Sequence, residues 1–252
     1  MKGPVCRLLW LCAVLAGIAP LAADAAPPPA TVPAIIQQNY DAAKQRHEAN
    51  PDDDQAAWQL GRACFDRAEF ARNSAERAKL ADEGMAACRK VIVRQPKLAA
   101  GHYYLAMNLA QLARTKLLGA LPLLGQMESE WKTARDLDEK MDYAGPDRYV
   151  GLLYRDAPGW PISLGDNAKA RQHLARAVEL SPNFPENHLN LIESYSAWND
   201  TNAAARAMEK FRPLLPAARK EFTGEYWAES WKDWNQRLEK IEARLNPRPK
   251  QN

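Results

Sequence analysis

The side chains that could carry acid–base, metal or nucleophilic chemistry lie at intervals that match no catalytic motif. The histidines stand at no metal-binding spacing from acids or cysteines. The chain has no nucleophile elbow, phosphate-binding loop or dinucleotide fingerprint. We therefore expect a non-enzymatic protein without metal or cofactor. The catalytic alternative is a hydrolase that uses Glu193 with Arg148 or a histidine. The histidines are His47, His102, His173 and His188.

Two cysteines could form a covalent link once the N-terminal segment is removed. Cys64 and Cys88 fall in two facing helices of one repeat when the repeats described below are aligned. In an oxidising compartment such a pair forms a disulfide if the Cα atoms come within about 7 Å. We predict a Cys64–Cys88 disulfide, and the alternative is that both are small buried hydrophobic residues.

Paired helices must position these side chains, because the chain contains the spacing of a tetratricopeptide repeat. It reads Gly151-x2-Tyr154, an insertion, and then Ala170-x3-Leu174-x2-Ala177-x4-Pro182. This is a helix–turn–helix pattern of roughly 34 residues, in which small residues lie where two helices touch and proline ends the second helix. Such units bury their apolar faces only by stacking, so one unit predicts others on both sides.

The same pattern recurs along the chain and gives about four repeats. A leading helix from Ala34 to Glu48 should cover the first repeat, and a trailing helix from Lys220 to Leu245 should cover the last. An insertion around Asn73 to Lys79 should lengthen the turn of the first repeat. No segment alternates like a half-buried strand, so we predict an all-α tetratricopeptide solenoid with N- and C-terminal capping helices. The repeats begin near Asp54, Ala99, Ala144 and Pro185.

The N-terminal segment has the features of a secretion signal. A basic start precedes the apolar run from Leu8 to Leu21, and Ala23-Asp24-Ala25 fits the small-x-small cleavage rule. The run is shorter than the roughly 20 residues that span a bilayer, and no small residue precedes Cys12 as lipid attachment requires. We predict a signal peptide over 1–25, a Pro/Ala-rich spacer over 26–33, a helical domain over 34–246 and a disordered tail over 247–252. The mature protein should be periplasmic.

The distribution of charge argues against a nucleic-acid partner. The formal net charge is +3 for 252 residues, and the basic residues gather into no stripe. No second apolar segment is long enough to cross a membrane. We therefore expect protein or small-molecule partners.

The insertions carry a more specific resemblance. Residues 157–166 read Ala-Pro-Gly-Trp-Pro-Ile-Ser-Leu-Gly-Asp, and residues 182–188 read Pro-x2-Pro-Glu-Asn-His. With the Gly101–Ala106 run and the Leu/Gly insert after it, these motifs resemble the T-component family of TRAP transporter systems from about Gln55 to Phe211. The resemblance implies a periplasmic helical protein that works with a solute-binding protein, self-associates and holds an apolar ligand. Family members can be lipoproteins, and this chain lacks a convincing lipid-attachment cysteine.

The first helices of a tetratricopeptide stack line a concave groove, which is the expected binding site. The side chains predicted to point into it are aromatic, apolar and charged, a mixture that suits an apolar ligand or a peptide held by polar anchors. The alternative is that the insertions or the capping helices fill the groove. The predicted groove residues are Trp58, Arg62, Phe65, Tyr103, Met107, Arg148, Leu152, Leu189 and Glu193, with Trp160 as a further candidate.

Three apolar features each allow more than one interpretation. Trp160 either fills the gap between the helices of its own repeat or contacts a ligand or partner. The leucine-rich insert over 117–124 forms a lid, a subunit contact or part of the core. The trailing helix carries an apolar stripe that either seals the last repeat or docks a partner. The stripe consists of Trp227, Trp231, Trp234, Leu238, Ile241 and Leu245.

The sequence thus predicts a non-catalytic periplasmic binding or adaptor protein. The expected partner is a periplasmic solute-binding protein of a TRAP system, with a second copy of the chain and an apolar small molecule as further candidates. The alternative is a general tetratricopeptide scaffold for assembly of cell-envelope proteins.

Overall fold

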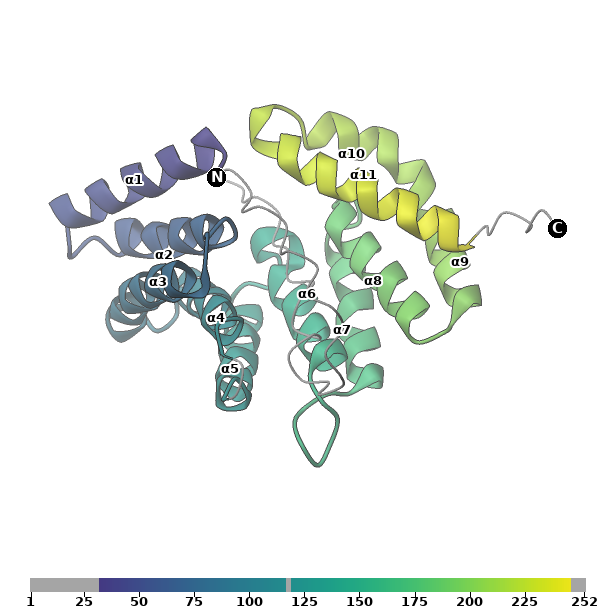
Figure 1. Ribbon diagram of the computed structural model, residues 1–252, viewed down its shortest axis with the longest axis horizontal. Coiled ribbons are helices and arrows are strands. Elements are labelled where there is room, and N and C mark those ends of the chain that lie inside the picture. Colours follow the sequence, from purple (N-terminus) through teal and green to yellow (C-terminus); the bar gives the residue numbers. More distant parts are fainter. Residues whose placement is uncertain (1–31, 117–118, 246–252) are drawn as a thin grey trace.

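A computed structural model describes residues 32–116 and 119–245 of the chain. Within these residues the regular secondary structure is helical, apart from an isolated bridge between Gly159 and Gly165. The helices follow one another as antiparallel pairs that turn gradually into a superhelix (Figure 1). This arrangement confirms the predicted all-α tetratricopeptide solenoid. The predicted signal peptide over 1–25 and tail over 247–252 lie outside the described residues.

Each repeat contributes a first and a second helix. Successive helices pack on each other, and the first helices α2 and α4 also contact each other across two repeats. The first helices are α2 (Asp54–Ala68), α4 (Ala99–Ala113), α6 (Met141–Asp156) and α8 (Pro185–Ala197). The second helices are α3 (Ser74–Arg94), α5 (Leu121–Leu137), α7 (Asn167–Leu180) and α9 (Thr201–Phe211). The capping helices are α1 (Ala34–Ala49), the short η1 (Arg212–Leu214), α10 (Leu215–Glu221) and α11 (Glu225–Leu245).

Small residues set the close approach of helices within and between repeats. A Cβ atom on Gly61 would lie 2.3 Å from Cys88 Sγ, and one on Gly151 would lie 2.7 Å from Leu174 Cγ. Real Cβ atoms do not come so close to other atoms, so glycine at these positions lets the paired helices pack. The Gly151–Leu174 contact joins two positions of the repeat pattern quoted above.

Two histidines tie first helices to the proline that ends the preceding repeat. His102 Nε2 lies 2.9 Å from the Pro96 carbonyl oxygen, and His188 Nε2 lies 2.7 Å from the Pro182 carbonyl oxygen. Both side chains are buried, and burial lowers the pKa of His188. These contacts show that the two histidines are part of the core.

Two predicted helix boundaries were wrong. The residues Asn73 to Lys79 do not lengthen a turn, because Asn73 caps α3 by accepting a hydrogen bond from the Glu76 N–H and the helix begins at Ser74. The trailing helix does not start at Lys220. Gly224 has a φ of +90°, which separates α10 from α11.

The predicted disulfide is also wrong, because Cys64 and Cys88 are free buried thiols. Cys64 packs in a cluster with Ala43, Leu60 and Ala87 on the side of α1, whereas Cys88 belongs to the core cluster that includes α4. Burial raises the pKa of both thiols, which keeps them protonated. The two cysteines therefore act as small core residues, which was the alternative interpretation.

Part of the leucine-rich insert extends α5. Leu124 is fully buried, whereas Leu121 is exposed to solvent at the start of the helix. Leu117 and Leu118 lie outside the described residues. Of the described leucines, Leu124 therefore belongs to the core and Leu121 lies on the surface.

Candidate functional site

Most of the predicted groove residues do not line an open groove. From the second repeat onward, the apolar ones are buried in the two largest core clusters. Arg148 is also buried, and Glu193 is partly buried. The buried apolar members of the prediction are Phe65, Tyr103, Met107, Leu152 and Leu189.

The helix α11 fills the groove along α8. The Arg237 guanidinium donates hydrogen bonds to Glu186 Oε1 at 2.7 Å, Asn190 Oδ1 at 2.6 Å and Glu193 Oε2 at 2.7 Å. Trp234 Nε1 donates to Glu186 Oε2 at 2.7 Å. Buried ion pairs of this kind hold their partners firmly, because either charge would be costly to leave alone. The interpretation in which a capping helix fills the groove is therefore correct for this half of the solenoid.

The middle of the concave face is occupied by a turn that Arg148 holds. Asp142, Tyr143 and Ala144 have φ values of 48°, 57° and 61°, a left-handed turn before the regular part of α6. Arg148 donates to Asp142 Oδ2 at 2.9 Å and to Asn187 Oδ1 at 2.9 Å. Because Arg148 is bound here and Glu193 is bound to Arg237, the two do not form the catalytic pair of the hydrolase alternative.

An open cavity of about 670 Å³ remains at the N-terminal end of the concave face. It lies between α1, α2 and the start of α11. Both α1 and α2 contribute apolar side chains together with polar or charged ones, a composition typical of sites that bind an amphipathic ligand. We call this space the N-terminal cavity. Its lining residues are Ile35, Asn39, Ala42, Ala43, Arg46, Trp58, Gln59, Arg62, Ala63, Asp66, Glu225 and Tyr226.

Trp58 and Arg62 are the predicted groove residues that line this cavity. The Trp58 ring stacks on Tyr104 with centroids 5.7 Å apart, and its Nε1 donates to Gln55 Oε1 at 3.0 Å. These two contacts fix the plane of the indole against the wall. Arg62 NH2 donates to the Tyr226 hydroxyl at 2.5 Å. A rigid aromatic surface and a fixed cation are therefore presented side by side.

Asp66 gives the cavity a carboxyl group that stays protonated at neutral pH. Burial is the main cause that raises its pKa to about 8; Arg62 opposes this shift, and the nearby Asp142 and Glu69 charges add to it. Arg62 Nε lies 3.8 Å from Asp66 Oδ2. A protonated carboxyl can donate a hydrogen bond as well as accept one. Asp66 can therefore bind an acceptor on a ligand.

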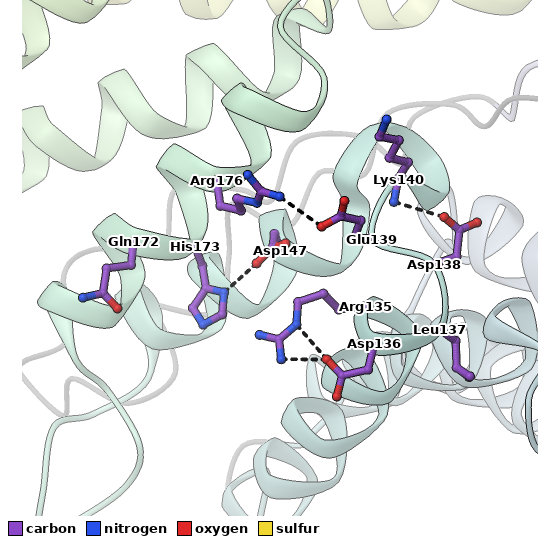
Figure 2. A pocket seen from close by; sticks show the side chains of 10 residues that line it. All are labelled: Arg135, Asp136, Leu137, Asp138, Glu139, Lys140, Asp147, Gln172, His173 and Arg176. Carbon is purple, nitrogen blue, oxygen red and sulfur yellow. Dashed lines mark hydrogen bonds and ion pairs between the residues drawn. The ribbon is translucent and has the colours of Figure 1, made fainter.

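A second, wider cleft of about 760 Å³ lies between the α5–α6 turn and α7. His173 Nδ1 lies 2.7 Å from Asp147 Oδ1, and Arg176 pairs with Glu139 at 3.1 Å, as Figure 2 shows. None of the ten described residues that line the cleft carries a hydroxyl or thiol group. The oriented imidazole therefore has no nucleophile to activate among these residues.

Trp160 lies outside the groove and does not fill its own repeat. Its side chain is 88% exposed, and Ile162 beside it is also exposed. The loop over 157–166 projects away from α10 and α11, at the opposite end of the α6–α7 pair (Figure 1). The inclusion of Trp160 among the groove residues was wrong, as was the interpretation in which it packs between helices. Contact with a partner remains a hypothesis.

Sequence analysis missed several residues of the N-terminal cavity. Asp66 and Ala63 lie on α2, at positions that would be buried if another first helix preceded it. Asn39 and Arg46 come from the leading helix, and Tyr226 comes from α11, which lies far away in sequence. The signal available was the pair of polar residues Gln59 and Asp66 on the face of α2 that also carries Ala63. Tyr226 carried no such signal.

Neither a metal cluster nor a membrane-spanning helix occurs in residues 32–116 and 119–245. No three histidine, cysteine or acidic residues of this part are grouped as a metal site would require. No helix of this part is both long and apolar enough to cross a bilayer.

Comparison with known proteins supports the fold. The chain is similar to the crystal structure of MamA, with a TM-score of 0.51, 16% identity and coverage of 73% of this chain and 91% of that one. It is also similar to TTC0263, a thermophilic tetratricopeptide protein of Thermus thermophilus, with a TM-score of 0.56, 20% identity and coverage of 81% and 93%. At these identities the likeness shows the tetratricopeptide fold alone.

A family model matches part of the sequence. The model described as "RMD1-3: Regulator of microtubule dynamics protein 1-3" matches residues 35–118, about a third of the 252-residue chain. None of the curated proteins matches the chain. The matched segment contains α1, α2 and thus most of the N-terminal cavity.

Proposed function

We propose that the chain is a non-catalytic binding or adaptor protein whose N-terminal cavity holds a segment of a partner protein. The observation that carries the proposal is the open cavity of about 670 Å³, walled by Trp58 and Arg62, in a concave face that is otherwise filled. Tetratricopeptide stacks use such surfaces to hold polypeptide segments. Arg148 and Glu193, the residues of the catalytic alternative, are engaged in structural contacts.

The finer part of the proposal concerns place and partner. A periplasmic location rests on the signal-like segment over 1–25 and its expected cleavage after Ala25. A solute-binding protein of a TRAP system as the partner rests on the resemblance carried by residues 157–166 and 182–188. Self-association and retention of an apolar small molecule belong to the same resemblance, and the apolar side chains of the cavity lining suit such a molecule.

A general scaffold for cell-envelope proteins is the second candidate function. It is supported by the exposed side chains of Trp160 and Ile162, which offer a contact surface away from the cavity. A scaffold needs more than one such surface, whereas a dedicated adaptor needs one specific site.

Affinity capture with the mature chain tests the proposal. The chain would be immobilised, incubated with periplasmic extract and eluted for native mass spectrometry, which reports partners, subunit number and retained ligand together. Enrichment of one solute-binding protein supports the TRAP adaptor. Enrichment of several unrelated envelope proteins without a solute receptor supports the scaffold. Recovery of the chain alone would contradict both.

A matched pair of variants shows whether the N-terminal cavity is used. Asn39 is exposed and lines the cavity, and Gln38 is exposed on the same helix but does not line it. Asn39→Trp should fill the cavity and abolish capture, whereas Gln38→Trp should leave it unchanged. Equal capture by both variants would place the binding site elsewhere.

A further inference from the structure

We infer that the N-terminal cavity accepts an amphipathic α-helix of the partner, which docks as the first helix of an additional repeat and carries an acidic side chain near its C-terminal end. The inference rests on the proposed function and specifies the class of partner segment. It goes beyond that function because it assigns the secondary structure, the register and the charge of the bound segment.

The stacking of α4 on α2 shows how one first helix docks on the next. Tyr104 of α4 stacks on Trp58 of α2, with ring centroids 5.7 Å apart. Asn108 Nδ2 donates to the Gly61 carbonyl oxygen at 2.8 Å. Gln111 Nε2 donates to Glu69 Oε1. These α4 side chains form the face on which the preceding first helix rests.

The same face of α2 lines the cavity. Because α2 begins at Asp54 and α4 at Ala99, equivalent positions are 45 residues apart. The α2 residues equivalent to Tyr104, Asn108 and Gln111 are Gln59, Ala63 and Asp66, and all three line the N-terminal cavity. The surface that would receive a preceding first helix is therefore the surface left open.

Helix α1, which forms the other wall of the cavity, also has an equivalent in the repeats. Helix α1 packs on α2 in the place that α3 takes beside α4. At the α3–α4 contact a Cβ atom on Gly84 would lie 2.4 Å from Asn108 Oδ1, so a small residue allows the approach. At the α1–α2 contact Ala43 and Ala63 pack together in one cluster. A helix in the cavity would thus pack on α1 and α2 in the same way that α2 packs on α3 and α4.

The lining specifies the side chains of the docked helix. Ile35, Ala42 and Trp58 offer apolar surface, so one face of the helix should carry small and aromatic residues. Glu69, which receives the Gln111 amide, directly follows the last residue of α2. Asp66 takes the position of Gln111 on α2, and its raised pKa of about 8 means that its carboxyl keeps a proton that it can donate. Arg62 provides a cation in the same lining. An acidic side chain near the C-terminal end of the docked helix can accept the Asp66 proton in a hydrogen bond and pair with the Arg62 cation.

The length of the segment follows from the repeats. The helices α2 and α4 each contain 15 residues. The docked helix should therefore contain about four turns, because α1 and α2 offer a wall of that length.

Photocross-linking of the captured complex identifies the bound segment. A benzoylphenylalanine at position 39 of the full mature chain should cross-link to an amphipathic helix of the partner with an acid near its C-terminal end. The same probe at position 38 should give no such product. Cross-links from position 39 to a loop or strand of the partner, or to a second copy of this chain, would overturn the inference. Because partner capture would still be seen, the proposed function would survive that result.

A peptide provides an independent measurement. The probe is a synthetic peptide of residues 53–69, the segment that in the intact chain docks on α4. A fluorescent form should bind the mature chain saturably, bind Asn39→Trp at least about tenfold more weakly, and bind Gln38→Trp unchanged. Glu69→Gln in the peptide should also weaken binding. Absence of saturable binding, or equal binding by the two variants, would overturn the inference.

Discussion

The Arg62 guanidinium donates a hydrogen bond to the Tyr226 hydroxyl at 2.5 Å and so links the first repeat to the last helix, 164 residues away in sequence. Elsewhere α11 packs on α8 and α9, and it is joined to the preceding segment by the Arg219–Asn235 hydrogen bond and the Arg212–Glu242 ion pair. At the start of α11 this bond adds a contact with the wall of the N-terminal cavity to the packing of the buried Trp227 on Phe222.

Tyr226→Phe should loosen the start of α11. Loss of the hydroxyl removes one hydrogen bond to a charged group, and the free energy of unfolding should fall by about 1–2 kcal/mol. Hydrogen exchange should rise in the peptides near Glu225 but not at Arg237. Tyr195→Phe, at a partly buried tyrosine far from this contact, is the control. Unchanged exchange at the start of α11 would show that the bond does not hold it.

Arg237→Met should destabilise the C-terminal half strongly. Arg237 and Glu186 have side chains only 5% and 6% exposed, so removing the cation leaves a buried carboxylate. The expected loss is about 3–5 kcal/mol in denaturant unfolding, and adding Glu186→Gln should recover part of it. The control is Arg212→Met, which breaks the exposed pair with Glu242 and should cost less than about 1 kcal/mol. Similar losses for both would contradict the described network.

Asp66→Asn should change how stability depends on pH. The folded state raises the pKa of Asp66 to about 8 from an ordinary value of 3.8. Between these values the folded chain keeps a proton that the unfolded chain releases, so rising pH removes up to about 1.4 kcal/mol of stability per pH unit. The variant should be more stable than the wild type at pH 8, with the difference shrinking toward pH 4. The control is Asp82→Asn, at an exposed site on α3, which should leave the pH dependence of stability unchanged. An unchanged pH dependence in Asp66→Asn would contradict the prediction.

Trp160→Ala should leave the fold intact. The exposed side chain buries almost no area, so the free energy of unfolding should change by less than about 0.5 kcal/mol. Trp131→Ala is the matched comparison, because Trp131 is fully buried and stacks on Tyr149 at 5.5 Å. That change should cost about 3–5 kcal/mol. A large loss at Trp160 would mean that the loop packs against the body of the protein.

The repeat pattern predicted the fold because the information is local. Small residues such as Gly61 and Gly151, and terminators such as Pro96 and Pro182, determine where two helices touch and where each ends. The repeat starts at Asp54, Ala99 and Pro185 were confirmed. In the third repeat α6 is counted from Met141, but its regular part follows the left-handed turn that ends at the predicted Ala144.

The binding site was harder to predict because it depends on contacts between distant segments. The pattern indicates that Glu186 and Glu193 face the concave side, but it does not indicate that Arg237 returns to cover them. The break between α10 and α11 depends on one glycine, Gly224, which a helical apolar stripe does not reveal. Thus only Trp58 and Arg62 of the predicted groove residues line the open N-terminal cavity.

Hydrogen–deuterium exchange of the mature chain with and without its captured partner tests the central claim most directly. If the N-terminal cavity is the binding site, protection should appear in α1 over residues 35–46 and in α2 over residues 58–66, with no change in the 157–166 loop. Protection confined to that loop, or to the cleft around His173, would contradict the account.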